Sequence, residues 1–177
     1  MTNQSFEAEN SEKARQEGLR IYLGMVKKAT QAPLSAEDLE TFNTVLADVG
    51  GGGFDDLLGT VFAHIGPERV QLELKVGPSH LQPFGLANGG VYCSLGETAG
   101  SIAGFIAGGA KVPVVGVNNN TDFYRSAKVG DVIVSTATPV HLGRTMQVWQ
   151  IEHVRKSDEK TLARTNLRLA VLNETQK

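Results

Sequence analysis

The sequence predicts an α+β fold in which one antiparallel sheet of about six strands curls around a single long helix. The first observation is a stretch from Gly89 to Ala110 that is rich in small residues and long enough for a central helix. The second is a set of strand-like segments, two before this stretch and four after it. Because short turns join neighbouring strands, antiparallel pairing is expected, and the long helix packs on the curled sheet.

The first part of the chain, residues 1–33, is polar and is expected to form an extension before the main domain, residues 34–177. Helical character lies in Ser11–Ala29, where apolar residues recur at helical spacing. Pro33 ends this segment, because proline removes a backbone donor and restricts the residue before it.

A second helix is expected to start at Ser35, which can cap it, with Asp38 in its first turn. Its apolar face consists of Leu39, Phe42, Val45 and Leu46. The glycine run at residues 50–53 then ends the helix.

Six later segments have the composition of β-strands and are separated by turn residues. Arg69–Val76 shows the clearest pattern, because apolar and polar residues alternate strictly along it, as in a strand with one buried face. The six segments are Leu58–Ile65, Arg69–Val76, Val112–Tyr124, Asp131–His141, Arg144–Arg155 and Thr161–Leu172.

The long helix contains glycines at every fourth position, which therefore share one face. They are Gly96, Gly100, Gly104 and Gly108. An interior glycine destabilises a helix by about 1 kcal/mol relative to alanine, so this stripe indicates very close packing against a neighbour. Glu97 is the only charged residue from Gly89 to Ala110, and burying a carboxylate is unfavourable. A catalytic role would explain why a carboxylate is present in this helix.

Composition excludes several classes of function. A net charge of −2 and a pI near 6.1 give no reason to expect a nucleic-acid partner. The single cysteine, Cys93, rules out an internal disulfide, and the N-terminus has no signal-peptide pattern, so a cytoplasmic location is expected. The stretch from Gly89 to Ala110 is long enough to span a bilayer, but Glu97 and the lack of flanking anchors favour a buried helix and no membrane contact.

The segment QPFGLANGGVYCSLGETAGSIAG, together with the predicted architecture, resembles the hotdog-fold acyl-CoA thioesterases. The resemblance is greatest to the phenylacetate-pathway (PaaI-like) type and to the 4-hydroxybenzoyl-CoA and 1,4-dihydroxy-2-naphthoyl-CoA thioesterases. It extends over about Ser35 to Leu172 and includes VVGVNNNTDFYRSAKVGD and HLGRTMQVWQIE. It implies a hotdog fold, hydrolysis of an acyl-CoA to free acid and coenzyme A without a further cofactor, and a homodimer that usually pairs into a homotetramer.

The resemblance also implies roles for individual residues. Glu97 is the nucleophile or general base, and the backbone N–H of Gly89 binds the thioester oxygen. Gln82 holds the thioester, and Ser101, one turn after the acid, assists the acid or the attacking water. Asn88 stands where the family usually has histidine; it can donate a hydrogen bond or cap the helix, but it cannot take a proton at neutral pH. Phe123 lies where some relatives have a polar residue, so acyl selectivity does not transfer.

Helix geometry requires two copies of the chain. Gly89 and Glu97 are eight residues apart, about 12 Å along a helix axis. An oxyanion donor and an attacking carboxylate must both lie within about 3 Å of one carbonyl group. Two antiparallel helices can meet this condition, so a two-fold dimer with two shared sites is predicted.

Coenzyme A carries phosphates, so basic and polar groups are expected at the entrance of the site. The candidates for binding the substrate or coenzyme A are Gly90, Phe84, Arg125, Ser126, His141, Gly143 and Arg144; His141 is a weaker candidate, as is Lys128. Each charged candidate is explained equally well as a solvated residue at a strand end.

Two other functions fit the same fold. Asn88 motivates a non-catalytic protein that binds an acyl-CoA. A hotdog hydratase would need an acid–base pair of Asp and His near the helix start, which the sequence lacks there. The four histidines show no metal-ligand spacing, so no metal site is predicted, and Cys93 is expected to be an unreactive thiol. The sequence does not identify the acyl group.

Overall fold

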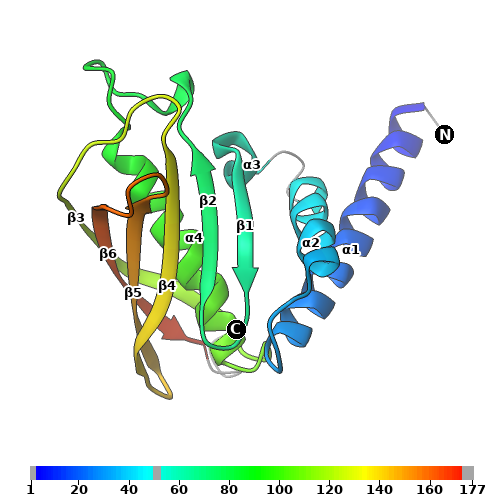
Figure 1. Cartoon of the computed structure of the whole chain (residues 1–177). Coiled ribbons are helices and arrows are strands. Elements are labelled where there is room, and N and C mark those ends of the chain that lie inside the picture. The colour runs from blue at the N-terminus through cyan, green and yellow to red at the C-terminus, as the bar shows by residue number, and fades with distance from the viewer. Residues whose placement is uncertain (1–2, 50–52, 173–177) are drawn as a thin grey trace.

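The computed structural model describes residues 3–49 and 53–172 of the 177-residue chain. Two helices come first, α1 (Asn3–Ala29) and α2 (Ala36–Val49). They pack against each other and lie beside one edge of the sheet (Figure 1). α1 begins eight residues before the predicted Ser11, because no glycine or proline interrupts the segment there.

The predicted cap of α2 is confirmed. Ser35 Oγ accepts a hydrogen bond from the backbone N–H of Asp38 at 3.2 Å, and the Asp38 carboxylate accepts one from the Ser35 N–H at 3.1 Å. Phe42 is fully buried, as expected for the apolar face of this helix. The predicted end of α2 in the glycine run falls partly on residues 50–52, which lie outside the described residues.

The sheet has six antiparallel strands, which confirms the predicted fold class. They are β1 (Thr60–Ile65), β2 (Val70–Lys75), β3 (Val114–Phe123), β4 (Val132–Leu142), β5 (Met146–Arg155) and β6 (Thr161–Val171). Their order across the sheet is β1-β2-β4-β5-β6-β3. β1 and β3 are therefore the two edges, and β3 is at least partly exposed at every position.

Helix α4 (Gly89–Ala107) lies behind the sheet and packs on it, as predicted (Figure 1). Its glycine stripe faces β6, where alternate residues point to the same side. The side chains opposite Gly96, Gly100 and Gly104 are Thr165, Leu167 and Leu169. Gly108 differs, because it caps the end of the helix, and an added Cβ would meet only backbone oxygens, none closer than 3.5 Å.

Two local expectations are wrong. The chain from Phe54 to Leu58 forms a short helix, α3, which ends at Gly59 with φ of 67°, so strand β1 begins at Thr60 and not at Leu58. Strand β3 does not pair with β4, its neighbour in sequence, but with β6 at the far edge. The rule that short turns join paired strands fails here because the loop from β3 leads across the end of the sheet to β4.

Trp149, Ile151, Leu167 and Leu169 are among the fully buried side chains between the sheet and α4. A short 3₁₀ helix, η1 (Pro78–His80), leads into the loop before α4. None of the helices in the described part of the chain is long and apolar enough to cross a membrane.

Candidate active site

Asn88 caps the start of α4. Its φ and ψ are −64° and 140°, and its Oδ1 accepts a hydrogen bond from the Gly90 N–H at 2.8 Å. The N–H of Gly89, the first residue of the helix, has no acceptor among the described residues. Since a helix N-terminus carries partial positive charge, this N–H is available to an oxygen that gains negative charge.

Glu97 lies two turns further along α4, half-buried, with its carboxylate directed at edge strand β3. Its Oε2 accepts a hydrogen bond from Asn119 Nδ2 at 2.9 Å. Gly116 lies against the other oxygen so closely that a Cβ there would overlap Glu97 Oε1. The pairing of β3 with β6 shifts register between Gly116 and Asn118, so a β-bulge lies beside the carboxylate. The glycine and the bulge together make room for the Glu97 carboxylate beside strand β3.

A cavity of about 370 Å³ opens beside the first turn of α4. Four of the predicted site residues line it, namely Gln82, Gly89, Arg125 and Ser126. Phe123 covers Gly89, since a Cβ on that glycine would lie 3.0 Å from Phe123 Cζ. Tyr92 completes the wall and packs edge-on against Phe123, with ring centroids 5.9 Å apart. Burial raises the pKa of Tyr92, so its phenol stays neutral at neutral pH.

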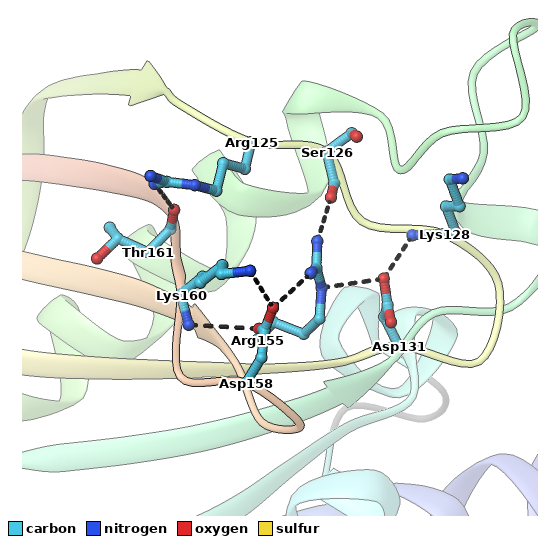
Figure 2. Close-up of polar contacts among 8 residues, drawn as sticks. All are labelled: Arg125, Ser126, Lys128, Asp131, Arg155, Asp158, Lys160 and Thr161. Atoms are coloured by element: carbon cyan, nitrogen blue, oxygen red, sulfur yellow. Dashed lines mark hydrogen bonds and ion pairs between the residues drawn. The ribbon is translucent and has the colours of Figure 1, made fainter.

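The loop between β3 and β4, residues 124–131, forms the rim of this cavity and is called the rim loop. Arg155 of β5 holds this loop in place, and Figure 2 shows the contacts of Arg155. Its Nη2 donates to the backbone oxygen of Ser126 at 2.7 Å, and its Nε lies 3.3 Å from Asp131 Oδ2. Its Nη1 also pairs with Asp158 Oδ2 at 3.0 Å. Two carboxylates therefore balance the charge of Arg155, which serves to hold the loop.

Two other cations, Arg125 and Lys128, also belong to the rim. Arg125 Nη1 donates to the backbone oxygen of Thr161 at 2.8 Å, a contact that leaves its charge in place (Figure 2). Neither Arg125 nor Lys128 forms an ion pair with a carboxylate in the described part of the chain. Lys160, by contrast, pairs with Asp158 at 3.3 Å. The rim thus has local positive charge on a protein that is slightly acidic as a whole.

The candidates His141, Gly143 and Arg144 lie in a different place. His141 is near the end of β4, and Gly143 and Arg144 are in the turn that follows, at the opposite end of β4 from the loop with Arg125. β4 has 11 residues, which separates the two groups by about 30 Å within one chain. Local packing explains the glycine at position 143, since a Cβ there would lie 2.7 Å from the Met146 backbone oxygen.

Ser101 and Phe84 also lie apart from the Gly89 cavity. Ser101 lines a separate hollow of about 300 Å³, together with Tyr22 of α1 and Phe105 of α4. Phe84 is 87% exposed at the tip of the loop before α4. One chain therefore brings together Gln82, Gly89 and the Arg125 loop, but it does not bring Glu97 into the same cavity.

Sequence reasoning missed Asn119 and Gly116, the two β3 residues that touch Glu97. One signal was present. Three consecutive asparagines, residues 118–120, interrupt a segment that otherwise has the composition of a strand. Asparagine is disfavoured in strands, so such a run indicates that the side chains have another use.

Comparison with known proteins identifies the family. A family profile described as "Thioesterase superfamily" matches residues 84–162, the part of the chain that contains α4 and the rim loop. The 1,4-dihydroxy-2-naphthoyl-CoA hydrolase of Escherichia coli (strain K12) is 38% identical over 114 residues, which cover 64% of this chain and 80% of that protein. The chain belongs to the thioesterase superfamily.

Solved structures agree with this membership. A thioesterase from Haemophilus influenzae is 32% identical, with a TM-score of 0.68 over 76% of this chain and 90% of that one. AziG of S. sahachiroi is 40% identical, with a TM-score of 0.66 over 69% of this thioesterase and 98% of AziG. The resemblance inferred from the Gln82–Gly104 region is thereby confirmed, as are the hotdog fold and the assignment as a thioester hydrolase.

Proposed function

We propose that this thioesterase hydrolyses an acyl-CoA to a free acid and coenzyme A, with Glu97 as its catalytic carboxylate and the Gly89 N–H as its oxyanion donor. One observation carries the proposal: the first residue of α4 has an amide N–H with no acceptor among the described residues, and a half-buried carboxylate follows two turns later. The E. coli relative, which is named as a CoA thioester hydrolase, supports the choice of substrate class.

The chemistry needs few groups. A carbon–oxygen bond forms at the thioester carbonyl, the carbon–sulfur bond breaks, and coenzyme A leaves as its thiolate. Glu97 acts in one of two ways: it attacks the carbonyl carbon, and water then hydrolyses the resulting anhydride, or it takes a proton from water as the water attacks. The Gly89 N–H binds the oxygen that becomes negative. Because a thiolate is a good leaving group, no strong general acid is required.

The two groups belong to different subunits in this proposal. They lie eight residues apart on one helix, about 12 Å along its axis, and Glu97 is absent from the cavity that contains Gly89. Strand β3, which lies beside Glu97, is an exposed edge. A two-fold dimer that joins this region of two copies would place Glu97 of one subunit near Gly89 of its partner. Two such dimers pair into the tetramer expected from the family resemblance.

Coenzyme A is proposed to enter along the rim loop. Arg125 and Lys128 supply positive charge for its phosphates, and Gln82 lies beside Gly89, where the thioester would be held. The far hairpin with His141 and Arg144 can contribute only from another subunit of the assembly. Asn88 does not favour a binding-only protein, because its capping bond to Gly90 accounts for it without an imidazole role.

The oxyanion role can be tested with Gly89→Pro. Gly89 is the first helical residue and Asn88 before it is extended, so the backbone tolerates proline at this position, and proline removes the N–H. Gly89→Ala is the matched control, because its Cβ also meets Phe123 while the N–H remains. We expect Gly89→Pro to lower kcat by about 10²- to 10³-fold relative to Gly89→Ala. Equal rates for the two variants would refute the role.

The shared site can be tested by mixing subunits. Glu97→Gln should lower turnover by about 10²- to 10⁴-fold, measured as coenzyme A release by mass spectrometry so that Cys93 does not interfere. A heterodimer of Glu97→Gln with Gly89→Pro has one intact site, so mixing two inactive variants should restore activity. Failure to restore activity in proven heterodimers would place both groups in one subunit. A wild type that releases no coenzyme A from a broad acyl-CoA panel would refute hydrolysis itself.

A further inference from the structure

His153 is a buried histidine on β5 that the proposed chemistry does not use. Its side chain is completely shielded from solvent. Its Nδ1 lies 2.7 Å from Ser135 Oγ, and its Nε2 lies 2.9 Å from Thr165 Oγ1. Burial lowers the pKa of His153 to about 3, so the ring is neutral near pH 7 and has a single N–H.

A continuous series of hydrogen bonds leads from this ring to Glu97. Thr165 Oγ1 on β6 lies 2.7 Å from Thr121 Oγ1 on β3. Thr121 Oγ1 donates to Asn119 Oδ1 at 3.2 Å, and Asn119 Nδ2 donates to Glu97 Oε2 at 2.9 Å. The series therefore crosses three strands and ends on the catalytic carboxylate proposed above.

Counting hydrogens fixes the direction of every bond in the series. Asn119 Nδ2 uses its two hydrogens on Glu97 and on the Cys93 backbone oxygen, which lies 3.0 Å away. Asn119 Oδ1 must then accept, and it takes the only hydrogen of the Thr121 hydroxyl. Thr121 consequently accepts from Thr165.

The same count continues into the sheet. Thr165 has given its hydrogen to Thr121, so it accepts from His153, whose proton must be on Nε2. The bare Nδ1 then accepts from the Ser135 hydroxyl. Each hydroxyl and ring N–H thus has one acceptor, and each hydrogen bond is donated in the direction that leads from Ser135 to Glu97.

A glycine in helix α4 leaves space for this series of hydrogen bonds. Gly96, next to Glu97, faces Thr165, and a Cβ on it would lie 2.8 Å from Thr165 Oγ1. Real Cβ atoms essentially never come that close, so any other residue at 96 would displace Thr165. The glycine thus keeps the helix turn of Glu97 directly over the hydroxyl series.

We propose that His153, Thr165 and Thr121 are positioning residues that hold the Asn119 amide in the orientation that donates to Glu97. The proposal rests on the catalytic role of Glu97 proposed above. An asparagine amide has two orientations of nearly equal shape, and the flipped one would place Oδ1 against the carboxylate. The Thr121 hydroxyl excludes the flip, because reversing its bond would require both threonine hydroxyls to turn and the buried His153 to change tautomer. The carboxylate is thereby held at the β3 edge.

Thr121→Val tests the positioning role of this hydrogen-bond series, because it removes the hydroxyl and keeps the side-chain shape. We expect kcat to fall about 10-fold or more while KM changes less than about twofold, since the acid is misplaced and the binding cavity is intact. Thr121→Ser, which restores the hydroxyl, should recover kcat to within about twofold. Thr136→Val is the matched control: it removes a β4 hydroxyl that accepts from Gln71 Nε2 at 2.9 Å, away from Glu97. Its kcat should equal that of the wild type.

A second measurement does not depend on turnover. ¹⁵N NMR of the His153 ring should show Nε2 protonated and Nδ1 bare. Two results would refute the positioning role and leave the proposed function unchanged. One is a proton on Nδ1, and the other is a kcat of Thr121→Val within about twofold of wild type while Glu97→Gln is inactive. Full activity of Glu97→Gln would refute the proposed function, and the NMR result would still decide the direction of the hydrogen bonds.

Discussion

Replacing Gly104 by alanine tests whether the glycine stripe sets the distance between α4 and the sheet. Gly104 is buried, and a Cβ there would lie 2.8 Å from Gln147 Oε1 and 3.4 Å from Trp149 Nε1. It would also overlap Leu169 Cδ1. Leu169 can turn aside, but Gln147 is tied on both sides: its Nε2 donates to the Gly104 backbone oxygen and its Oε1 accepts from Trp149 at 2.9 Å.

The opposing effects can be compared in magnitude. Alanine in place of glycine stabilises a helix by about 1 kcal/mol. Overpacking a core position is unfavourable by about 1–3 kcal/mol, and moving Gln147 weakens two hydrogen bonds worth about 1 kcal/mol each. We therefore expect Gly104→Ala to lower the free energy of unfolding by about 2 kcal/mol. For a chain of this length that corresponds to a fall in Tm of about 4–8 °C.

The assay is calorimetry or urea unfolding at one fixed protein concentration, because assembly of subunits also affects Tm. Gly108→Ala is the matched control on the same helix. Its Cβ would lie 3.5 Å from the nearest atom, the Phe105 backbone oxygen, and its φ of −76° suits alanine. We expect Gly108→Ala to be neutral or up to about 1 kcal/mol more stable. If Gly104→Ala were as stable as Gly108→Ala, the stripe would not set the helix–sheet distance.

Two further predictions concern the surroundings of Glu97. Because burial lowers the pKa of His153 from 6.5 to about 3, the unfolded chain binds a proton in this window that the folded chain does not. The free energy of unfolding should therefore fall, by as much as about 4 kcal/mol, as pH drops from about 6.5 to about 3; His153→Gln should flatten this dependence in urea titrations. Gly116→Ala would push its Cβ into Glu97 Oε1, so kcat should fall at least about 10-fold with Tm within about 2 °C of wild type. An unchanged kcat would show that β3 can shift to accommodate the new methyl group without displacing Glu97.

Local signals in the chain were sufficient for most of the fold. Ser35 and Asn88 predicted helix starts that the structure confirms, because capping depends on residues close in sequence. The glycine spacing predicted the packed face of α4 for the same reason. The pairing of β3 with β6 escaped sequence reasoning, since nothing local specifies which distant strand closes a sheet edge.

The site divides in the same way. The family resemblance singled out Gln82 and Gly89, and Glu97 also stood out as the only charge in its helix; the structure places Gln82 and Gly89 in one cavity. The sequence could not reveal that Arg125 joins them while His141 and Arg144 lie at the other end of β4. The positions of those residues depend on which end of a long strand each turn occupies.

The sequence by itself determined the residue types that the chemistry requires: an acid on a helix of small residues, a glycine pair at its start, and a cap before the pair. Only the tertiary structure decided what surrounds the acid. Asn119 and Gly116 reach Glu97 because β3 bulges beside α4, and His153 connects to it because three strands lie side by side. Those contacts join residues far apart in the chain, so they depend on strand register and helix packing, which no short segment encodes.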